Sequence, residues 1–152
     1  MSNAPLSGDW YNQLGSKMTL IADNDSGGGL SGEYNSAVGQ AKDVYILTGR
    51  YDAAPPAGEG TSVGWVVTFR NDILNAHSTS TWSGQYFDGG NERIITQWLL
   101  TSSTTPSDVW SSTRIGNDTF TRTAPTAAEI EKARAFTVGS PHPEDIIAMM
   151  RK

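Results

Sequence analysis

Residues Thr61–Arg70 read TSVGWVVTFR, a run in which apolar side chains alternate with small or polar ones. This period of two is typical of a β-strand whose two faces meet different environments. The same period continues through Leu74–Tyr86 and Glu92–Thr101. The chain is therefore predicted to be built from strands that bury one face each. The apolar faces of the first and last of these runs carry Val63, Trp65, Val67 and Phe69, and Ile94, Trp98 and Leu100.

Turn-forming residues separate the alternating runs at 24–29, 55–58, 70–72 and 88–91. Short connections of this kind predict antiparallel hairpins in sequence order. Eight such strands close into an up-and-down barrel, which has no exposed edges and can hold one small ligand. The predicted fold class is all-β: an eight-stranded antiparallel up-and-down β-barrel with a short, partly helical C-terminal extension. The strands are expected near residues 8–14, 17–22, 29–35, 43–51, 62–69, 74–86, 92–101 and 112–122.

The composition excludes several classes of partner and site. The 152 residues carry a formal net charge of −5, whereas nucleic acid or an anionic membrane would select a basic surplus, so neither partner is expected. The chain has no cysteine and only two histidines, which argues against disulfides, thiol catalysis and a metal site. No apolar run approaches the roughly 18 residues that span a bilayer, and residues 1–5 lack the apolar stretch of a signal peptide.

The last part of the chain differs from the rest. We expect an N-terminal extension at 1–7, the barrel at 8–123 and a tail at 124–152. Thr126–Glu129 forms a capping-box pattern that predicts a helix over Ala127–Phe136, and a second short helix is expected to start at Pro143. This tail is either a mobile or processed extension, or its apolar end at Ile146–Met150 docks on a neighbouring barrel.

Two short motifs resemble sites but lack the required context. Gly60–Gly64 fits the G-x-S-x-G pattern of serine hydrolases, yet a strand follows it where a helix is needed. Asp23–Asp25 resembles the start of a calcium loop, yet Tyr34 occupies the position of the bidentate glutamate. Neither motif predicts catalysis or metal binding.

Small polar side chains recur on strand faces that also carry tryptophan. If these faces point inward, the lumen combines aromatic walls with hydroxyls, an amide and a carboxylate. Buried polar groups cost roughly 1–3 kcal/mol each unless they are paired, so their concentration predicts a preformed site for a compact ligand with polar and apolar parts. The same faces could instead point outward as ordinary serine- and threonine-rich surface. The residues concerned are Asn12, Leu14, Ser16, Tyr34, Ser36, Ala76, Ser78, Ser80, Trp82, Trp98, Leu100 and Asp118.

The chain resembles the avidin/streptavidin family, and its streptavidin branch in particular. The resemblance covers residues 8 to about 123, with the family's motifs in the family's order. The matching segments are GDWYNQLGS (8–16), SAVG (36–39), LTGRYD (47–52), TWSGQY (81–86), TQWLLT (96–101) and GNDTF (116–120).

This resemblance implies a secreted, non-catalytic protein that binds biotin with high affinity and uses no cofactor; a cytoplasmic location stays open. It also implies a homotetramer in which Trp110 reaches a neighbouring subunit's site, and a lid formed by residues 36–42. For the ureido group it implies Asn12, Ser16 and Tyr34 at the oxygen, and Ser36 and Asp118 at the N–H groups. For the rest of the ligand it implies Ser80 at the sulfur, Ser78 with the backbone near Gln40 at the carboxylate, and Leu14, Val38, Gly39, Phe69, Trp82, Trp98 and Leu100 around the rings and chain.

Several positions depart from the streptavidin branch. Phe69 stands where that branch has tryptophan, and Ser80 where it has threonine. Arg114 and Asn117 replace leucine and histidine near the family's subunit interface, which makes the tetramer less secure than the barrel.

Two other functions compete with biotin binding. One is a lipocalin-like carrier of a different small ligand, although such sites are usually more apolar. The other is an esterase built on Ser62 or Ser36 with His77. The esterase is disfavoured because His77 has the opposite parity to Ser78 and should face away from the lumen.

Overall fold

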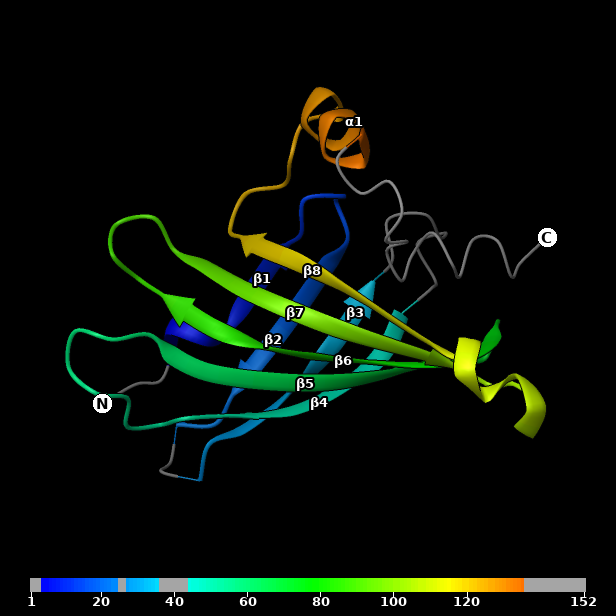
Figure 1. Cartoon of the computed structure of the whole chain (residues 1–152). Coiled ribbons are helices and arrows are strands. Elements are labelled where there is room, and N and C mark those ends of the chain that lie inside the picture. Colours follow the sequence, from blue (N-terminus) through cyan, green and yellow to red (C-terminus); the bar gives the residue numbers. More distant parts are fainter. Residues whose placement is uncertain (1–3, 25–26, 36–43, 136–152) are drawn as a thin grey trace.

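The protein is a closed barrel of eight antiparallel strands, as seen in the computed structural model (Figure 1), which describes residues 4–24, 27–35 and 44–135. Each strand pairs with its neighbours in chain order, and β1 pairs with β8 to close the barrel. The predicted fold class is thereby confirmed. The strands are β1 (Gly8–Tyr11), β2 (Lys17–Ala22), β3 (Gly29–Asn35), β4 (Val44–Tyr51), β5 (Thr61–Arg70), β6 (Asn75–Phe87), β7 (Arg93–Ser102) and β8 (Thr113–Thr121).

The strand bounds agree with the expected ones to within one residue, except at β1. This strand ends at Tyr11 because the next residue begins a turn. The Oδ1 atom of Asn12 accepts the backbone N–H groups of Leu14 (3.0 Å) and Ser16 (2.9 Å), and Gly15 adopts a φ of 87°. Asparagine side chains commonly compete with strand pairing in this way.

The inner faces of the strands form a single aromatic core. One row of residues in register crosses four strands, from Trp65 through Trp82 and Trp98 to Gly116. A Cβ atom at Gly116 would lie 2.1 Å from Cζ2 of Trp98, so only glycine lets this indole lie against β8. The interior is thus packed by ring faces and edges.

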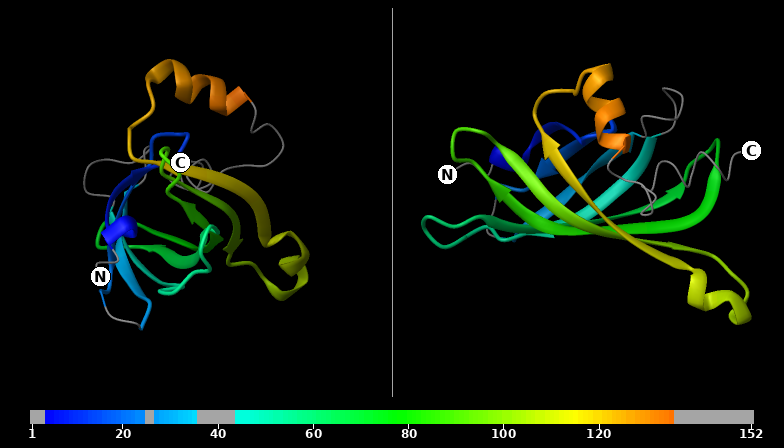
Figure 2. Two further views of the ribbon diagram at one scale, coloured as in Figure 1. Left: turned by 90° about the vertical axis from the view of Figure 1, so that its left-hand side faces the viewer. Right: turned by 45° about the horizontal axis from the view of Figure 1, so that its top comes forward.

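The two ends of the barrel differ. The β5–β6 and β7–β8 connections lie at one end, here called the mouth, where the short helix η2 (Pro106–Ser111) projects from the barrel (Figures 1 and 2). At the opposite end lies a 3-10 turn, η1 (Ala4–Leu6), whose Leu6 side chain is only 2% exposed. Neither short element was expected from the sequence.

Helix α1 (Ala127–Ala135) follows β8 and lies outside the barrel (Figure 2). Its predicted capping box is present: Thr126 N–H donates to Glu129 Oε1 (2.8 Å), and Glu129 N–H donates to Thr126 Oγ1 (3.1 Å). Within the described part of the chain, no helix is long and apolar enough to cross a membrane. Phe136 and the second helix expected near Pro143 lie outside the described residues.

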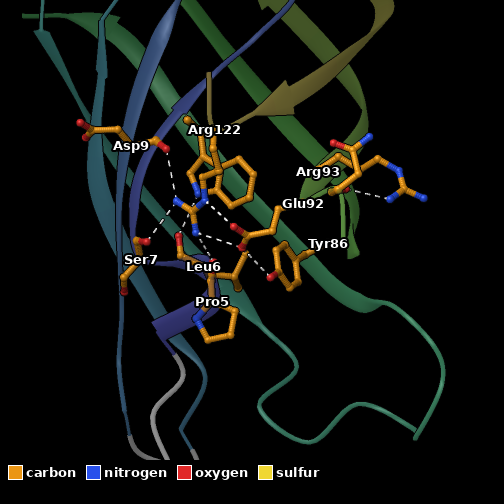
Figure 3. A network of polar contacts seen from close by, with 10 residues as sticks. Pro5, Leu6, Ser7, Asp9, Tyr86, Glu92, Arg93 and Arg122 are labelled. Carbon is orange, nitrogen blue, oxygen red and sulfur yellow. Dashed lines mark hydrogen bonds and ion pairs between the residues drawn. The ribbon is translucent and has the colours of Figure 1, made fainter. Parts of the chain in front are cut away.

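Arg122 holds the end of the barrel opposite the mouth together (Figure 3). Its guanidinium donates to the backbone carbonyls of Pro5, Ser7 and Asp9, and lies 3.7 Å from the ring centroid of Trp10. A guanidinium has five N–H donors in a fixed fork and stacks well on aromatic faces. One side chain therefore joins β8 to the N-terminal segment.

Glu92 completes this network. It accepts hydrogen bonds from the Tyr86 hydroxyl (2.8 Å) and from Arg122 (Nε to Oε1, 3.4 Å). These two bonds lower the pKa of Glu92, and the Tyr86 bond has the larger effect, while burial acts against it. Burial is the main reason why the pKa of Tyr86 is raised, and its bond to Glu92 adds to the effect. The ionised carboxylate and the neutral phenol thus stabilise each other.

We expect Arg122→Met to lower the free energy of unfolding by about 1–3 kcal/mol, because it removes a stacked cation and bonds to several carbonyls. Urea denaturation of the ligand-free protein at neutral pH measures this. The control is Arg93→Met, which removes a cation over Phe87 (5.1 Å) and a bond to one carbonyl, so it should cost less. An equal loss in both variants would contradict the role assigned to Arg122.

The same network predicts a pH dependence. Because its folded-state pKa is lowered, Glu92 stabilises the fold above its unfolded pKa of about 4.3, and this contribution is lost as the pH falls through the folded value. Solvent screening should limit the effect to less than about 1 kcal/mol. Glu92→Gln should therefore flatten the acid limb of the stability curve, and an unchanged acid limb would exclude Glu92 as its source.

Candidate functional site

The inner faces of the barrel bring together most of the residues expected to form the site. All of them are buried, with relative exposures of 4% or less. The reading in which these faces point outward is therefore wrong. The residues assembled are Asn12, Leu14, Ser16, Tyr34, Phe69, Ser78, Ser80, Trp82, Trp98, Leu100 and Asp118.

A fully buried carboxylate, Asp118, is the most costly group in this lumen. Its Oδ2 accepts the indole N–H of Trp82 (2.9 Å), and its Oδ1 accepts Nε2 of Gln13 (2.8 Å). Thr96 donates its hydroxyl to the backbone carbonyl of Asp118 (3.0 Å). Charge-assisted hydrogen bonds of this kind are stronger than neutral ones and fix the carboxylate in one orientation.

Trp82 connects four strands. Its N–H reaches Asp118 on β8, and its ring packs against Trp65 on β5 (centroids 5.8 Å apart, planes at 21°) and against Tyr34 on β3 (5.2 Å, 37°). Stacking fixes the plane of the indole, and the hydrogen bond fixes its direction. The aromatic wall and the carboxylate are therefore held by the same side chain.

The turn between β1 and β2 presents an amide in a fixed orientation. Because Oδ1 of Asn12 accepts two backbone N–H groups, its NH2 group is the end directed away from the turn. Ser16, at the end of the same turn, has no exposed surface. Tyr34 lies on the neighbouring strand β3, in register with Met18 of β2, and is likewise fully buried. All three side chains carry groups that can donate a hydrogen bond, and all three are buried.

Two inward hydroxyls lack partners. Among the residues that the structure describes, Ser78 Oγ and Ser80 Oγ are buried without any hydrogen-bond partner. A buried unsatisfied polar group costs about 1–3 kcal/mol, so two on one strand face indicate a site that a ligand or water completes. Both lie on β6, on the face that carries Trp82.

The wall opposite Trp98 is formed by smaller rings. Phe69 is fully buried and meets Tyr34 and Tyr45 edge to face, at 6.2 and 5.2 Å between centroids. Such contacts add about 0.5–1.5 kcal/mol beyond the buried area. Phe69 therefore belongs to a rigid aromatic corner.

One further predicted site residue, Trp110, is described but lies outside this cluster. Trp110 lies on η2 and is 83% exposed, so it is not buried in its own barrel. The other four lie outside the described residues: Ser36, Val38, Gly39 and Gln40.

Sequence reasoning missed three residues that support the site: Gln13, Thr96 and Trp65. Thr96 could have been found, because it shares the parity of Ile94 and Trp98. For Trp65 the sequence predicts only a place on the apolar face of its strand, whereas in the structure it stacks on Trp82. Gln13 gave no periodic signal, since β1 has already ended at that point.

Within the described residues, the features expected of an enzyme or metal site are not assembled. His77 and Ser62 are both exposed, and His77 has a φ of 50° that turns the start of β6. Among the described residues, no group of three or more histidine and acidic side chains could hold a metal ion.

Comparisons with known proteins agree with this geometry. The avidin-related proteins 7 and 1 of Gallus gallus are each 36% identical to the chain over 124 residues, and Gallus gallus avidin is 34% identical over 122 residues. Each comparison covers 77% of this chain and 77% of the relative. The model of the avidin family matches residues 1–123, and the chain therefore belongs to the avidin family.

Proposed function

We propose that the protein binds biotin tightly in the barrel lumen, without converting it. Membership of the avidin family confirms that the chain is not an enzyme. The observation that carries the proposal is the buried Asp118 carboxylate, held by Trp82 and Gln13 and facing a lumen lined by rings. Within the family we further propose a streptavidin-like character and secretion.

The polar groups of the lumen complement a cyclic urea. A ureido oxygen accepts hydrogen bonds, which Asn12, Ser16 and Tyr34 can donate. The ureido N–H groups need acceptors, which Asp118 supplies together with Ser36 in the proposed site. A carboxylate at the N–H side favours negative charge on the ureido oxygen and so strengthens its bonds, because linked hydrogen bonds polarise one another.

The remaining groups fit the apolar part of biotin. Trp82, Trp98 and Phe69 would enclose the bicyclic rings, with Leu14, Leu100 and Val38 beside them. The unpartnered Ser80 hydroxyl would face the thioether sulfur, and Ser78, with the backbone near Gln40, would face the carboxylate. Gly39 would belong to the lid. A lipocalin-like carrier of an apolar ligand fits less well, because such a ligand has no N–H group that could offset the desolvation of the buried carboxylate.

Titration with biotin, followed by calorimetry or tryptophan fluorescence, tests the proposal. We expect one biotin per chain with a dissociation constant well below the micromolar range. A biotin analogue without the ureido oxygen should compete poorly. Micromolar or weaker binding of biotin, or equal binding of that analogue, would refute the proposed function.

Asp118→Ala should weaken biotin binding by about 2 kcal/mol or more, the scale of a hydrogen bond to a charged group. This corresponds to roughly a 30-fold faster release if association is unchanged. Asp9→Asn is the matched control, because Asp9 is exposed and pairs with Lys17 (3.5 Å) on the outside. Dissociation rates measured by displacement compare the two, and an unchanged rate in Asp118→Ala would remove this residue from the site.

We also propose that the protein is a homotetramer in which Trp110 completes a neighbouring subunit's site. Trp110 and Val109 are 83% and 63% exposed on η2, which projects at the mouth (Figure 2). An indole so exposed is unusual for a monomer and suits insertion into a partner.

The outer face of β5–β8 supports the same proposal. One row in register runs Val66, Thr81, Leu99 and Ile115, and the next runs Thr68, Thr79, Thr101 and Thr113. Both rows are uncharged, and Leu99 and Ile115 are 48% and 61% exposed. Threonine hydroxyls are paired along the second row, Thr68 with Thr79 (3.0 Å) and Thr101 with Thr113 (2.8 Å). An uncharged and partly apolar face fits a second copy related by a two-fold axis.

Leu99→Lys should reduce the oligomer mass, because a two-fold interface places like charges near each other. Native mass spectrometry with and without biotin measures mass and stoichiometry together. Ile21→Lys is the control, since Ile21 is 59% exposed on β2, away from these rows. A monomeric wild type would overturn the proposed assembly, and a Leu99→Lys variant of wild-type mass would overturn its assignment to this face.

A further inference from the structure

His77 has a backbone conformation that sets it apart from the rest of the described chain. Among the described residues other than glycine, it alone has a positive φ, at 50°. The left-handed region is unfavourable for residues with a Cβ atom, although histidine, asparagine and aspartate adopt it more often than the others. Residues that their surroundings hold in such a conformation cluster at functional sites. The backbone of His77 therefore indicates a local role.

His77 lies in a β-bulge of β6, at the mouth of the barrel. The register of β5 with β6 changes from Thr68 opposite Thr79 to Arg70 opposite Asn75. Over this step β6 uses four positions where β5 uses two. Bulges at barrel rims and beside active sites commonly redirect a side chain. The extra residues of β6 are therefore placed where the strand enters the lumen wall.

Two hydrogen bonds of the main chain hold His77 in this conformation. Its N–H donates to Oδ1 of Asn75 (2.9 Å), and its carbonyl accepts the N–H of Ser103 (2.8 Å) in the β7–β8 connection. The His77 side chain is exposed and takes no part in the hydrogen bonds or ion pairs found among the described residues. The contacts of this residue are thus made by its backbone.

The residues on both sides of His77 face the lumen. Ala76 is 1% exposed and Ser78 is 4% exposed. Ser78 is in register with Ser102 on β7, and its hydroxyl has no hydrogen-bond partner among the described residues. The left-handed residue therefore directly precedes an unsatisfied hydroxyl of the proposed site.

The direction of Ser78 depends on this bulge. An extended conformation at residue 77 would turn its N–H away from Asn75, and the additional length of β6 would have to be taken up elsewhere in the strand. Because side chains alternate between the two faces of a strand, a shift by one residue would turn Ser78 out of the lumen. The bulge absorbs the additional length and leaves Ser78 on the inner face.

We propose that His77 is a positioning residue, whose left-handed backbone fixes the direction of the Ser78 hydroxyl in the empty site. This inference rests on the proposed function. It assigns the role to the main chain of His77 and none to the imidazole. A hydroxyl that already has its direction lowers the cost of binding, because it does not have to be ordered when the ligand enters.

Biotin release from the full chain tests this role. His77→Val should release biotin about three- to tenfold faster than wild type, the scale of one hydrogen bond, because a β-branched residue resists a positive φ. His77→Asn removes the same imidazole but tolerates this φ, so its release rate should stay within about twofold of wild type. His77→Ala should fall between them and replaces His77→Val if that variant does not fold. Gln85→Val is the matched control, because Gln85 is exposed on β6 in regular register with Ile95.

Two further measurements separate positioning from a general loss of stability. If His77 acts through Ser78, adding His77→Val to Ser78→Ala should not speed biotin release any further. Hydrogen exchange of the Ser103 amide needs no ligand, because the acceptor of this N–H is the His77 carbonyl. Its exchange should be faster in His77→Val and unchanged in His77→Asn.

The outcomes distinguish this inference from the proposed function. Equal release rates in His77→Val and His77→Asn would overturn the role of the backbone, and additive effects with Ser78→Ala would show that His77 does not act through Ser78. Faster release from Gln85→Val would show that any β-branched residue on β6 has this effect. Each of these results overturns the inference and leaves biotin binding intact. If wild type does not bind biotin, the proposed function itself fails, and the role of His77 in that site fails with it.

Discussion

The hydrogen bond between the Trp82 indole and the Asp118 carboxylate is the constraint on which the rest of the lumen depends. A carboxylate without exposed surface loses its hydration, and the effective penalty is several kcal/mol even after relaxation. Trp82 (2.9 Å) and Gln13 (2.8 Å) offset part of that penalty with fixed N–H donors. The donors must stay in place without a ligand, and this requires the stacking of Trp65 and the early turn after β1. Aromatic packing therefore serves to hold a charge as well as to fill space.

Closure of the barrel makes this arrangement possible. An open sheet would admit water to the carboxylate, whereas the pairing of Tyr11 on β1 with Thr121 on β8 closes the barrel. Ser78, Ser80 and Asp118 are then positioned by strand register, whereas Asn12 and Gln13 are positioned by the turn after β1. Such preorganisation lowers the conformational cost of binding, because few side chains have to be ordered when the ligand enters. The buried hydroxyls of Ser78 and Ser80 have no hydrogen-bond partner among the described residues. Their desolvation therefore stays uncompensated until a ligand or water bonds to them.

The sequence predicted the barrel well because its period of two survives in every long strand. The inward residues of β5, β6 and β7 could be assigned from parity alone, and their strand bounds were within one residue. Strand parity does not predict the residues where a side chain replaces backbone pairing. Asn12 ends β1 because its Oδ1 atom accepts the N–H groups of the turn. Gln13 then reaches Asp118 from a position that is no longer part of a strand. It also gives no information on Arg122, whose partners Pro5 and Ser7 are more than 110 positions away. Long-range contacts of single polar side chains produce no periodic pattern in the sequence.

The two ends of the barrel differ in how fully their polar groups are satisfied. At the end opposite the mouth, Arg122 bonds to several carbonyls and to Glu92, and the Leu6 side chain of η1 is buried. Opening that end would break a network in which cation, carboxylate and phenol depend on one another. Toward the mouth, the Ser78 and Ser80 hydroxyls on β6 are buried and have no hydrogen-bond partner among the described residues. The described chain therefore satisfies its polar groups at one end of the barrel and leaves two hydroxyls unsatisfied on the inner face of β6.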